Sequence, residues 1–455
     1  MADSTRHSVL FPDACTKKVV VQFDAEGQSS DGGVILLKSL DDGLGLTEDL
    51  VQHLVDGRDQ RKVEHDYSDL FRQRVLGIAL GYSDCNDSER IRSDPCLKMG
   101  CDRSPLDPDE DLGSQPTLSR FENAQSARGL IGMQRELESH VIKRLAKRRR
   151  KAKLVTIDLD PSCDATHGQQ QHALFHGKYG TWCYLPQFGF LTIDDDSEQF
   201  LFHTRLRPGN ARCYRGVIAL LRRVVPQIRK RFKQAKVRVR LDSGFSNPAL
   251  FDELERLKVQ YVVGMRGNQV LNRCAESLME DVRTSVEESG ETETQFTEAD
   301  YQARSWSRKR RAIIKAEVVC HPGRDPKDNA RFVITNLRHT PENVYKIYRA
   351  RGDAENRIKE LQDLDSDRTS CSRFLANQLR LLMTATAFVL YQELRWRMRH
   401  TEAARSQVGR IRLMLLKIGA RVVESVRRIL LHFPVSHPWQ DLWAAAAKAT
   451  GARFG

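Results

Sequence analysis

The sequence lacks the cysteine spacing that a zinc ribbon or a disulfide framework would need. Its ten cysteines are scattered between Cys15 and Cys371 in 455 residues, and no two of them form a C-x-x-C pair. Reduced thiols, as in a cytosolic protein, are the simplest account of this pattern. A long apolar run is also missing: the most apolar stretch, residues 381–391, has eleven residues and lies between Arg380 and Arg395. We therefore expect no signal peptide, no membrane-spanning segment and a cytoplasmic location.

Acidic residues are in the minority, which bears on the kind of partner. The chain has 73 Lys and Arg against 60 Asp and Glu, a net charge of +13 and a pI near 9.3. The excess gathers in two runs, residues 143–153 and residues 307–312. Clustered positive charge favours a polyanionic partner such as nucleic acid. Each run taken alone fits a solvated helix face or a linker equally well.

The order of apolar patterns along the chain predicts an α/β protein of about three domains. Residues 1–150 are mainly helical in pattern after a short strand at 19–23. Residues 153–264 follow the order strand, strand, strand, helix, strand, helix, strand, which places the first strand beside the fourth. Later segments are predicted to form a β-rich insertion, a long buried helix and two strand-like runs: residues 265–335, 373–398, 410–423 and 426–433.

Three acidic residues stand where such a fold could bring them together. Asp160 ends the strand-like run KLVTIDLD, and Asp242 ends the run VRVRLD. Glu355 lies in a helical pattern that spans residues 345–364. Two carboxylates at neighbouring strand ends and a third on a covering helix make an oxygen-rich site of the kind that Mg²⁺ or Mn²⁺ prefers. The pattern predicts metal-dependent phosphoryl transfer.

The helix around Glu355 is predicted to have one apolar and one chemical face. Tyr348, Arg351, Glu355 and Gln362 follow one another at steps of three, four and seven, so they line one side. An apolar stripe on the adjoining side would pack on the sheet; it consists of Ile347, Ala350, Ala354, Ile358 and Leu361. The alternative is a surface helix with ordinary charge pairs, such as Glu355 with Lys359.

Two further alternatives concern the segment after the first strand. Asp158 lies on the same side of the strand as Asp160, so it could be the ligand instead, or could orient a water on the metal. A zinc site is the second alternative, from four residues that are spaced suitably: Cys163, His167, His172 and His176. The Gly- and Gln-rich setting of these four favours a loop beside the strand.

Three motifs, taken in order, resemble those of a known family. They are DLDPSCDATHGQQ (158–170), RLDSGF (240–245) and YRARGDAENRIKEL (348–361). Together they resemble the DDE transposases of bacterial insertion sequences, and most closely insertion-sequence family thirteen-eighty. The resemblance implies an RNase H-like catalytic core at 151–264 and 336–400, interrupted by the β-rich insertion at 265–335. It further implies a mainly helical, DNA-binding region at 1–150 and a C-terminal region of helix and strand at 401–455.

The resemblance also implies a site and a reaction. Asp160, Asp242 and Glu355 would bind two Mg²⁺ or Mn²⁺ ions, with Asp160 bridging them. The enzyme would be an endonuclease that cuts the terminal inverted repeats of its element and joins the 3′ hydroxyl to target DNA. It would act as a homodimer or larger oligomer on DNA in the bacterial nucleoid. Related transposases have a tyrosine, arginine, glutamate and lysine signature; here Gln362 replaces the lysine, and Lys359 could take over its contact.

Several residues outside this signature are candidates for DNA contact. Tyr348 and Arg351 would position the scissile phosphate. Arg120 follows a helix start at which Ser114 or Thr117 could form the cap, and Trp306 could stack on an unpaired base or pack in a core. The basic run supplies four more candidates, Lys147, Arg148, Arg149 and Arg150. The same features fit two other functions, an RNase H-like nuclease without strand transfer and a non-catalytic DNA-binding protein derived from a transposase.

Overall fold

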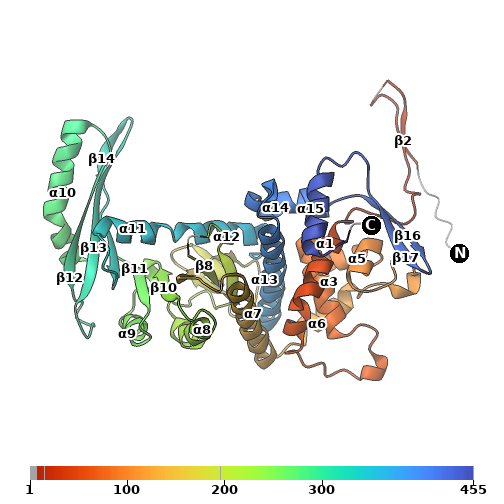
Figure 1. The fold of residues 1–455 in the computed structure, drawn as a ribbon, viewed down its shortest axis with the longest axis horizontal. Coiled ribbons are helices and arrows are strands. Elements are labelled where there is room, and N and C mark those ends of the chain that lie inside the picture. The colour runs from red at the N-terminus through yellow and green to blue at the C-terminus, as the bar shows by residue number, and fades with distance from the viewer. Residues whose placement is uncertain (1–7, 15, 195, 454–455) are drawn as a thin grey trace. The chain divides into compact units, whose positions relative to one another are not determined.

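The structure, a computed structural model, describes residues 8–14, 16–194 and 196–453 (Figure 1). Contacts divide the chain into two compact units. One contains residues up to 44, residues 64–118 and residues from 393 onward; the other contains residues 45–63 and 119–392. This division is coarser than the predicted domain boundaries, which remain predictions.

The first unit is built from helices and short strands. Its helices are α1 (Val34–Leu44), α3 (Tyr67–Leu80), α4 (Cys85–Ile91), α5 (Pro95–Gly100), α14 (Val408–Ile411) and α15 (Gln440–Thr450), with a π-helical turn at Arg412–Leu416. Its strands are β1 (Val9–Phe11), β2 (Val19–Val21), β3 (Gln28–Ser29), β16 (Ala420–Ser425) and β17 (Arg428–His432). β16 pairs with β3 and β17, and β1 pairs with β2. The mainly helical pattern predicted at the N-terminus is confirmed, but the strand predicted at 410–423 is wrong in its first half, which is helical.

The second unit contains the main sheet. Its described strands follow the order β12-β13-β15-β11-β10-β4-β8-β9, with β14 paired to β13. The central strands are β4 (Leu154–Pro161), β8 (Gln187–Ile193), β9 (Phe200–Arg205), β10 (Lys236–Leu241) and β11 (Gln260–Met265). β4, β10 and β11 run parallel to one another, and β8 and β9 form an antiparallel extension on the other side of β4. The predicted order is confirmed, including the pairing of the first strand with the fourth.

Helices cover this sheet on both faces, as its largely apolar strands require. The helices of the unit are α2 (Leu46–Val51), α7 (Ala127–Arg148), α8 (Val217–Arg231), α9 (Pro248–Arg256), α10 (Gln269–Ser289), α11 (Pro341–Arg349) and α12 (Gly352–Gln362). Figure 1 shows α8 and α9 on the side of the sheet opposite to α11 and α12. A small sheet of β5 (Asp164–Ala165), β7 (Thr181–Tyr184) and β6 (Leu174–His176) follows β4.

Two helices, α6 (Gln115–Asn123) and α13 (Phe374–Arg397), contribute residues to both units. Among the described residues, α13 is the one helix long and apolar enough to cross a membrane by length and composition. Within its most apolar window, 89% of the residues are buried inside the structure, as the sequence predicted for a core helix.

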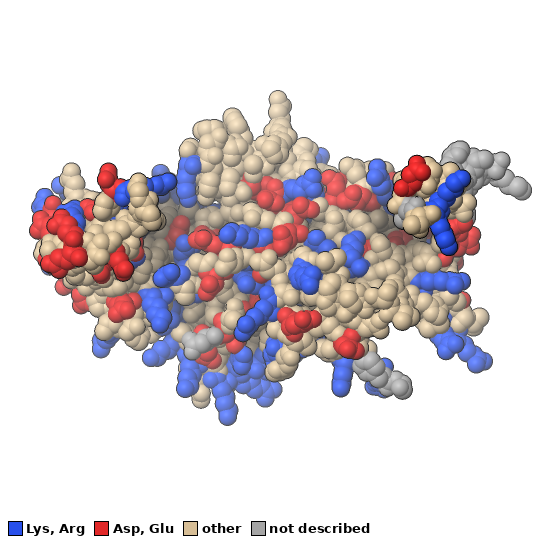
Figure 2. Space-filling view, turned by 90° about the horizontal axis from the view of Figure 1, so that it is seen from above, with Lys and Arg blue, Asp and Glu red and all other residues tan. Residues whose placement is uncertain are grey.

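The predicted β-rich insertion contains four strands, and it also contains a long helix that was not predicted from the sequence. This helix is α10, whose buried residues recur at helical spacing: Leu271, Ala275, Met279, Val282 and Val286. The helix packs on β12 (Glu293–Tyr301) and β13 (Arg310–His321), which extend the main sheet together with β14 (Arg324–Asp328) and β15 (Arg331–Thr335). Many charged residues lie between these apolar positions, so the helical spacing was not recognised in the sequence. In Figure 2, Asp and Glu gather at the end where Figure 1 places α10, so this outer face does not favour a phosphate backbone.

Candidate active site

The carboxyl ends of β4 and β10 bring two of the predicted residues side by side. The strands are in parallel register, with Leu159 opposite Leu241, so Asp160 and Asp242 are the next residues on neighbouring strands. The Asp242 side chain accepts a hydrogen bond of 2.9 Å from the amide of Gly244 and caps the turn that follows. Strand order alone therefore brings together two residues that are distant in sequence.

The third residue comes from a helix that is broken, not continuous as predicted. α11 ends at Arg349 and α12 begins at Gly352. Between them the amide of Arg351 bonds to the carbonyl of Tyr348, three residues back, which tightens the chain. The uninterrupted helical spacing across residues 345–364 gave no sign of this break. Of the predicted apolar stripe, Ala354, Ile358 and Leu361 are buried, whereas Ala350 is exposed at the break.

Arg351 joins the strands to the helix. Its Nη1 lies 2.8 Å from Asp160 Oδ2, and its Nη2 lies 3.0 Å from Glu355 Oε1. The residue predicted to hold a phosphate is thus the counter-ion of two of the three carboxylates. Only a small part of the Asp160 side chain is exposed, whereas 56% of the Glu355 side chain is exposed.

The three carboxylates share one electrostatic environment. Burial raises the pKa of Asp160 to about 7 against the attraction of Arg351, and the negative charges of Asp242 and Glu355 add to the rise. Tyr348 belongs to the same neighbourhood: burial raises the pKa of its phenol, Arg351 opposes the rise, and Asp242 adds to it. Its oxygen would lie 2.5 Å from a Cβ at Gly264, so only glycine fits at that point of β11.

Asp160, Asp242, Arg351 and Glu355 line a pocket of about 530 Å³, and Tyr348 is not among its lining residues. Lys359 and Gln362 also line it, as the predicted helix face required, so Lys359 is placed to replace the missing lysine. Sequence reasoning missed two further cations in the lining, Lys178 and Arg266. Arg266 directly follows β11, at the same edge of the sheet as Asp160 and Asp242, so the strand-end argument could have found it. Lys178 lies between β6 and β7, and no sequence pattern indicated that it would line this pocket.

The donor set fits a divalent cation. Three carboxylates reach one pocket, and burial, with the negative charges of Asp242 and Glu355, raises the pKa of Asp160. Carboxylate oxygens are ligands that a divalent cation prefers. Among the residues that the structure describes, no three His, Cys, Asp or Glu side chains already form a metal-binding group. The Arg351 guanidinium lies between Asp160 and Glu355 instead. Their role as metal ligands remains a prediction.

Asp158 has a different environment from Asp160. It is fully buried, and Arg240 binds it through two hydrogen bonds of 2.7 Å. Arg240 also donates to the carbonyl of Ile347 at 3.2 Å, which ties α11 to the sheet. Because Arg240 occupies its oxygens, Asp158 does not reach the pocket to orient a water, and the structure favours Asp160 as the candidate ligand.

The zinc alternative finds no support in the geometry. His172 packs edge-on against Phe374, with ring centroids 5.3 Å apart, and His176 packs against Tyr179 at 4.9 Å. Within the described part of the chain, no three of the four candidate side chains come together as a metal-binding group.

The residues predicted to contact DNA outside the pocket differ in their exposure and in their partners. Arg120, Lys147 and Arg150 are exposed. Arg149 forms an ion pair with Asp196 at 2.5 Å, and Arg148 lies over the ring of Phe200. These two are therefore engaged within the protein, and none of the five is shown to touch DNA.

Trp306 is a packing residue. Its side chain is buried against Phe251 and Tyr301, with ring centroids 5.0 and 5.2 Å apart, and the Arg310 guanidinium lies 5.1 Å from its ring centre. The structure therefore contradicts the stacking role and supports the packing alternative. The basic run beside it is paired as well: Arg310 binds Asp252 and Glu255, and Arg311 binds Glu298.

Comparison with known protein families gives a match over most of the chain. A model of the protein family described as transposase DDE domain group 1 matches residues 11–451, nearly the whole chain. No curated protein matches the sequence.

Proposed function

Because the chain belongs to the DDE transposase family, we propose that it cuts DNA at the ends of a mobile element and joins the freed 3′ hydroxyl to a target. One observation carries this proposal: Asp160, Asp242 and Glu355 reach a single basic-lined pocket from two strand ends and a covering helix. The element would be a bacterial insertion sequence, most like family thirteen-eighty. The terminal inverted repeats and the target DNA would be the partners, bound by a homodimer or larger oligomer.

The roles of the residues follow from their placement. Asp160, Asp242 and Glu355 would hold two Mg²⁺ or Mn²⁺ ions, which when bound neutralise charge and activate the attacking oxygen. Arg351 would keep Asp160 and Glu355 in place before DNA enters and would then contact the scissile phosphate. Lys178, Arg266 and Lys359 add positive charge to the pocket that would receive this phosphate. No protein nucleophile is needed, because water and then the DNA 3′ hydroxyl attack.

The test uses the DNA that flanks the gene. A plasmid carrying the inverted repeats that border the reading frame is incubated with the full chain in Mg²⁺ or in EDTA, and nicked and joined products are separated on gels. We expect cuts at the repeat ends and joined products in Mg²⁺ alone. Absence of any metal-dependent cut, with the repeats bound, would overturn the proposal.

Two other functions give different products in the same assay. A nuclease without strand transfer would cut but would leave no joined DNA. A non-catalytic DNA-binding protein would shift the repeats in a gel and cut nothing. The three carboxylates in one pocket favour catalysis over binding alone.

A further inference from the structure

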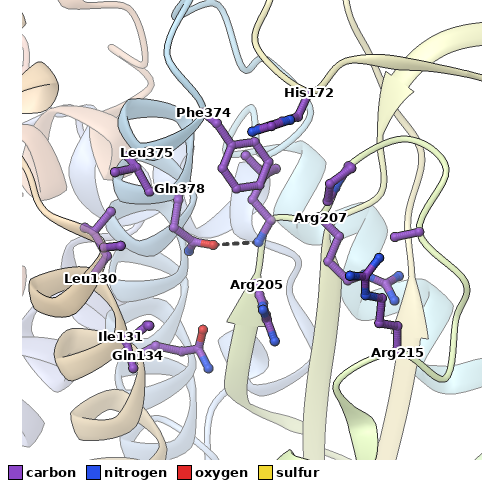
Figure 3. A pocket seen from close by; sticks show the side chains of 14 residues that line it. Leu130, Ile131, Gln134, His172, Arg205, Arg207, Arg215, Phe374, Leu375 and Gln378 are labelled. Carbon is purple, nitrogen blue, oxygen red and sulfur yellow. Dashed lines mark hydrogen bonds between the residues drawn. The ribbon is translucent and has the colours of Figure 1, made fainter.

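A second pocket is lined in part by the segment that follows β9. It has a volume of about 340 Å³ and is lined by α7, by residues 205–215 and by the first turns of α13 (Figure 3). None of the three predicted carboxylates lines it. All of its lining residues belong to the second unit.

Positive charge without a carboxylate partner distinguishes this pocket. Arg205, Arg207 and Arg215 line it, and within the described residues none of the three forms an ion pair with Asp or Glu. The nearby carboxylate of Glu138 is already taken by Arg223, through two hydrogen bonds of 2.8 Å, and by His203. Partial burial lowers the pKa of the Arg205 guanidinium, and the positive charges of Arg223 and Arg215 lower it further. The three arginines therefore leave an excess of positive charge that an anion would relieve.

Within the described residues, two buried donors in this pocket have no acceptor. Arg207 is 3% exposed; its Nε donates to Leu185 O at 2.9 Å and its Nη1 to Cys213 O at 3.1 Å, but its Nη2 has no partner. Gln378 accepts a 2.7 Å hydrogen bond from the amide of Leu206 through Oε1, which leaves its Nε2 as a donor without a partner. Figure 3 shows both side chains in the pocket, with the Gln378 hydrogen bond dashed. An unsatisfied buried donor is unfavourable, so a hydrogen-bond acceptor from a ligand would stabilise the pocket.

The opposite wall of the pocket is apolar and partly aromatic. Leu130 and Ile131 of α7 face Phe374 and Leu375 of α13. Phe374 packs edge-on against His172, and 48% of Ile131 is exposed. A flat apolar group could lie on this wall while an anionic group reaches the arginines.

The position of Arg207 connects the two pockets. Its hydrogen-bond acceptors belong to Leu185 and Cys213, and both of these residues line the carboxylate pocket. The segment that carries Arg207 is therefore a shared wall. Cys213 of this segment lines the carboxylate pocket, and Arg207 and Arg215 line the second pocket.

We propose that this second pocket binds one unpaired nucleotide of the DNA strand, with its phosphate on Arg205, Arg207 and Arg215 and its base on the wall of Ile131 and Phe374. This inference rests on the proposed function, because it assigns an additional contact to the same DNA substrate. An unpaired nucleotide is required because a base stacked in a duplex offers no free face to the wall.

The test measures binding without cleavage. Fluorescence anisotropy of a labelled single-stranded oligonucleotide is recorded with the full chain in EDTA. Arg205→Ala/Arg215→Ala removes two exposed charges of the pocket, and Ile131→Glu places a negative charge on its wall. The matched control is Lys230→Ala/Arg231→Ala, which removes two exposed positive charges from the last turn of α8, outside both pockets. A series of oligonucleotides with one abasic position each tests the base contact.

We expect the pocket variants to weaken binding at least tenfold relative to the control pair, and to reduce the salt dependence more than the control does. One abasic position should weaken binding to the parent protein and have no effect on Ile131→Glu. Equal affinities of pocket and control variants would overturn the proposal. So would displacement of the oligonucleotide by inorganic phosphate with no abasic position having an effect, which would show a simple anion site. Metal-dependent cutting is scored separately, so the proposed function and this inference fail on different readouts.

Discussion

Asp158 and Asp160 lie two residues apart on the same strand and face the same side of the sheet, yet their surroundings differ. Arg240 closes off Asp158, which has no exposed surface. Arg351 also binds Asp160, but the carboxylate opens into a pocket and lies near two further acids. The first arrangement is a closed pair of one arginine and one carboxylate, whereas in the second one arginine binds two carboxylates of a group of three.

This difference separates a structural ion pair from a candidate reactive site. Removing one partner of a sealed pair leaves a buried charge alone, which costs stability. Removing Asp160 leaves Arg351 with Glu355 and relieves repulsion, so the fold should tolerate it. Replacement by Asn should therefore lower the stability of the fold at Asp158 and impair DNA cleavage at Asp160.

The largest expected effect is on cleavage at the other two carboxylates of the open site. Asp242→Asn and Glu355→Gln each remove a ligand charge with little change in shape, and the loss of several kcal/mol of charge stabilisation should slow cleavage by roughly 10³-fold or more. Nicking rates in Mg²⁺ and gel shifts of the repeats measure the two properties separately. A variant that cuts at a near-normal rate would remove its residue from the site.

Substitution in the buried pair of Asp158 and Arg240 should lower the stability of the fold. Asp158→Asn leaves Arg240 buried without its partner, and we expect a loss of about 3–5 kcal/mol, seen as a lower thermal unfolding midpoint. Asp160→Asn serves as the matched control and should leave the midpoint unchanged or slightly raised. Equal midpoints for the two variants would show that the contrast between them is wrong.

Replacing Asp158 and Arg240 together tests whether the lost stability comes from an unpaired buried charge. Asp158→Leu/Arg240→Met removes the charges together, so the double variant should recover much of the stability that Asp158→Asn loses. A double variant as unstable as the single one would mean that Arg240 acts mainly through the carbonyl of Ile347.

A smaller effect is expected at Lys359, on the open side. If Lys359 replaces the lysine absent at Gln362, Lys359→Ala removes a charged hydrogen bond to phosphate worth about 1.5–3 kcal/mol, a rate drop of roughly tenfold or more. Gln362→Lys should partly rescue it, since both residues line the pocket. Rates like those of the parent would mean that Lys359 contributes only a helical charge pair of a few tenths of a kcal/mol.

The smallest effect should come from charges outside both sites. Lys147, Arg150 and Lys151 are exposed at the end of α7, and neutralising them should reduce the log-log salt slope of repeat binding by about 0.9 for each phosphate that the protein no longer neutralises. Cleavage at saturating DNA should not change. An unaltered slope would show that the run is a linker.

The sequence predicted how Asp160 and Asp242 come together better than it predicted the helices near them. The order of strands and helices placed Asp160 beside Asp242, because parallel strands joined by a helix end at one edge of the sheet. The break before Gly352 was missed because helical spacing continues across it, and α10 was missed because charged residues fill the positions between its apolar ones.

Contacts between distant segments could not be predicted. The pairing of Asp158 with Arg240 depends on strand register, and the arginine pocket depends on α7, β9 and α13 meeting in space. Neither has a local sequence signature. The burial of Trp306 likewise depends on Phe251, Tyr301 and Arg310, which come from separate elements.

The most direct test of the account is the nicking of repeat-bearing plasmid by Asp160→Asn in Mg²⁺, measured with its binding to the same DNA and its unfolding midpoint. We expect a folded protein that binds the repeats as the parent does and does not cut them. Near-normal cutting by this variant would contradict the central claim that Asp160 belongs to the reactive site.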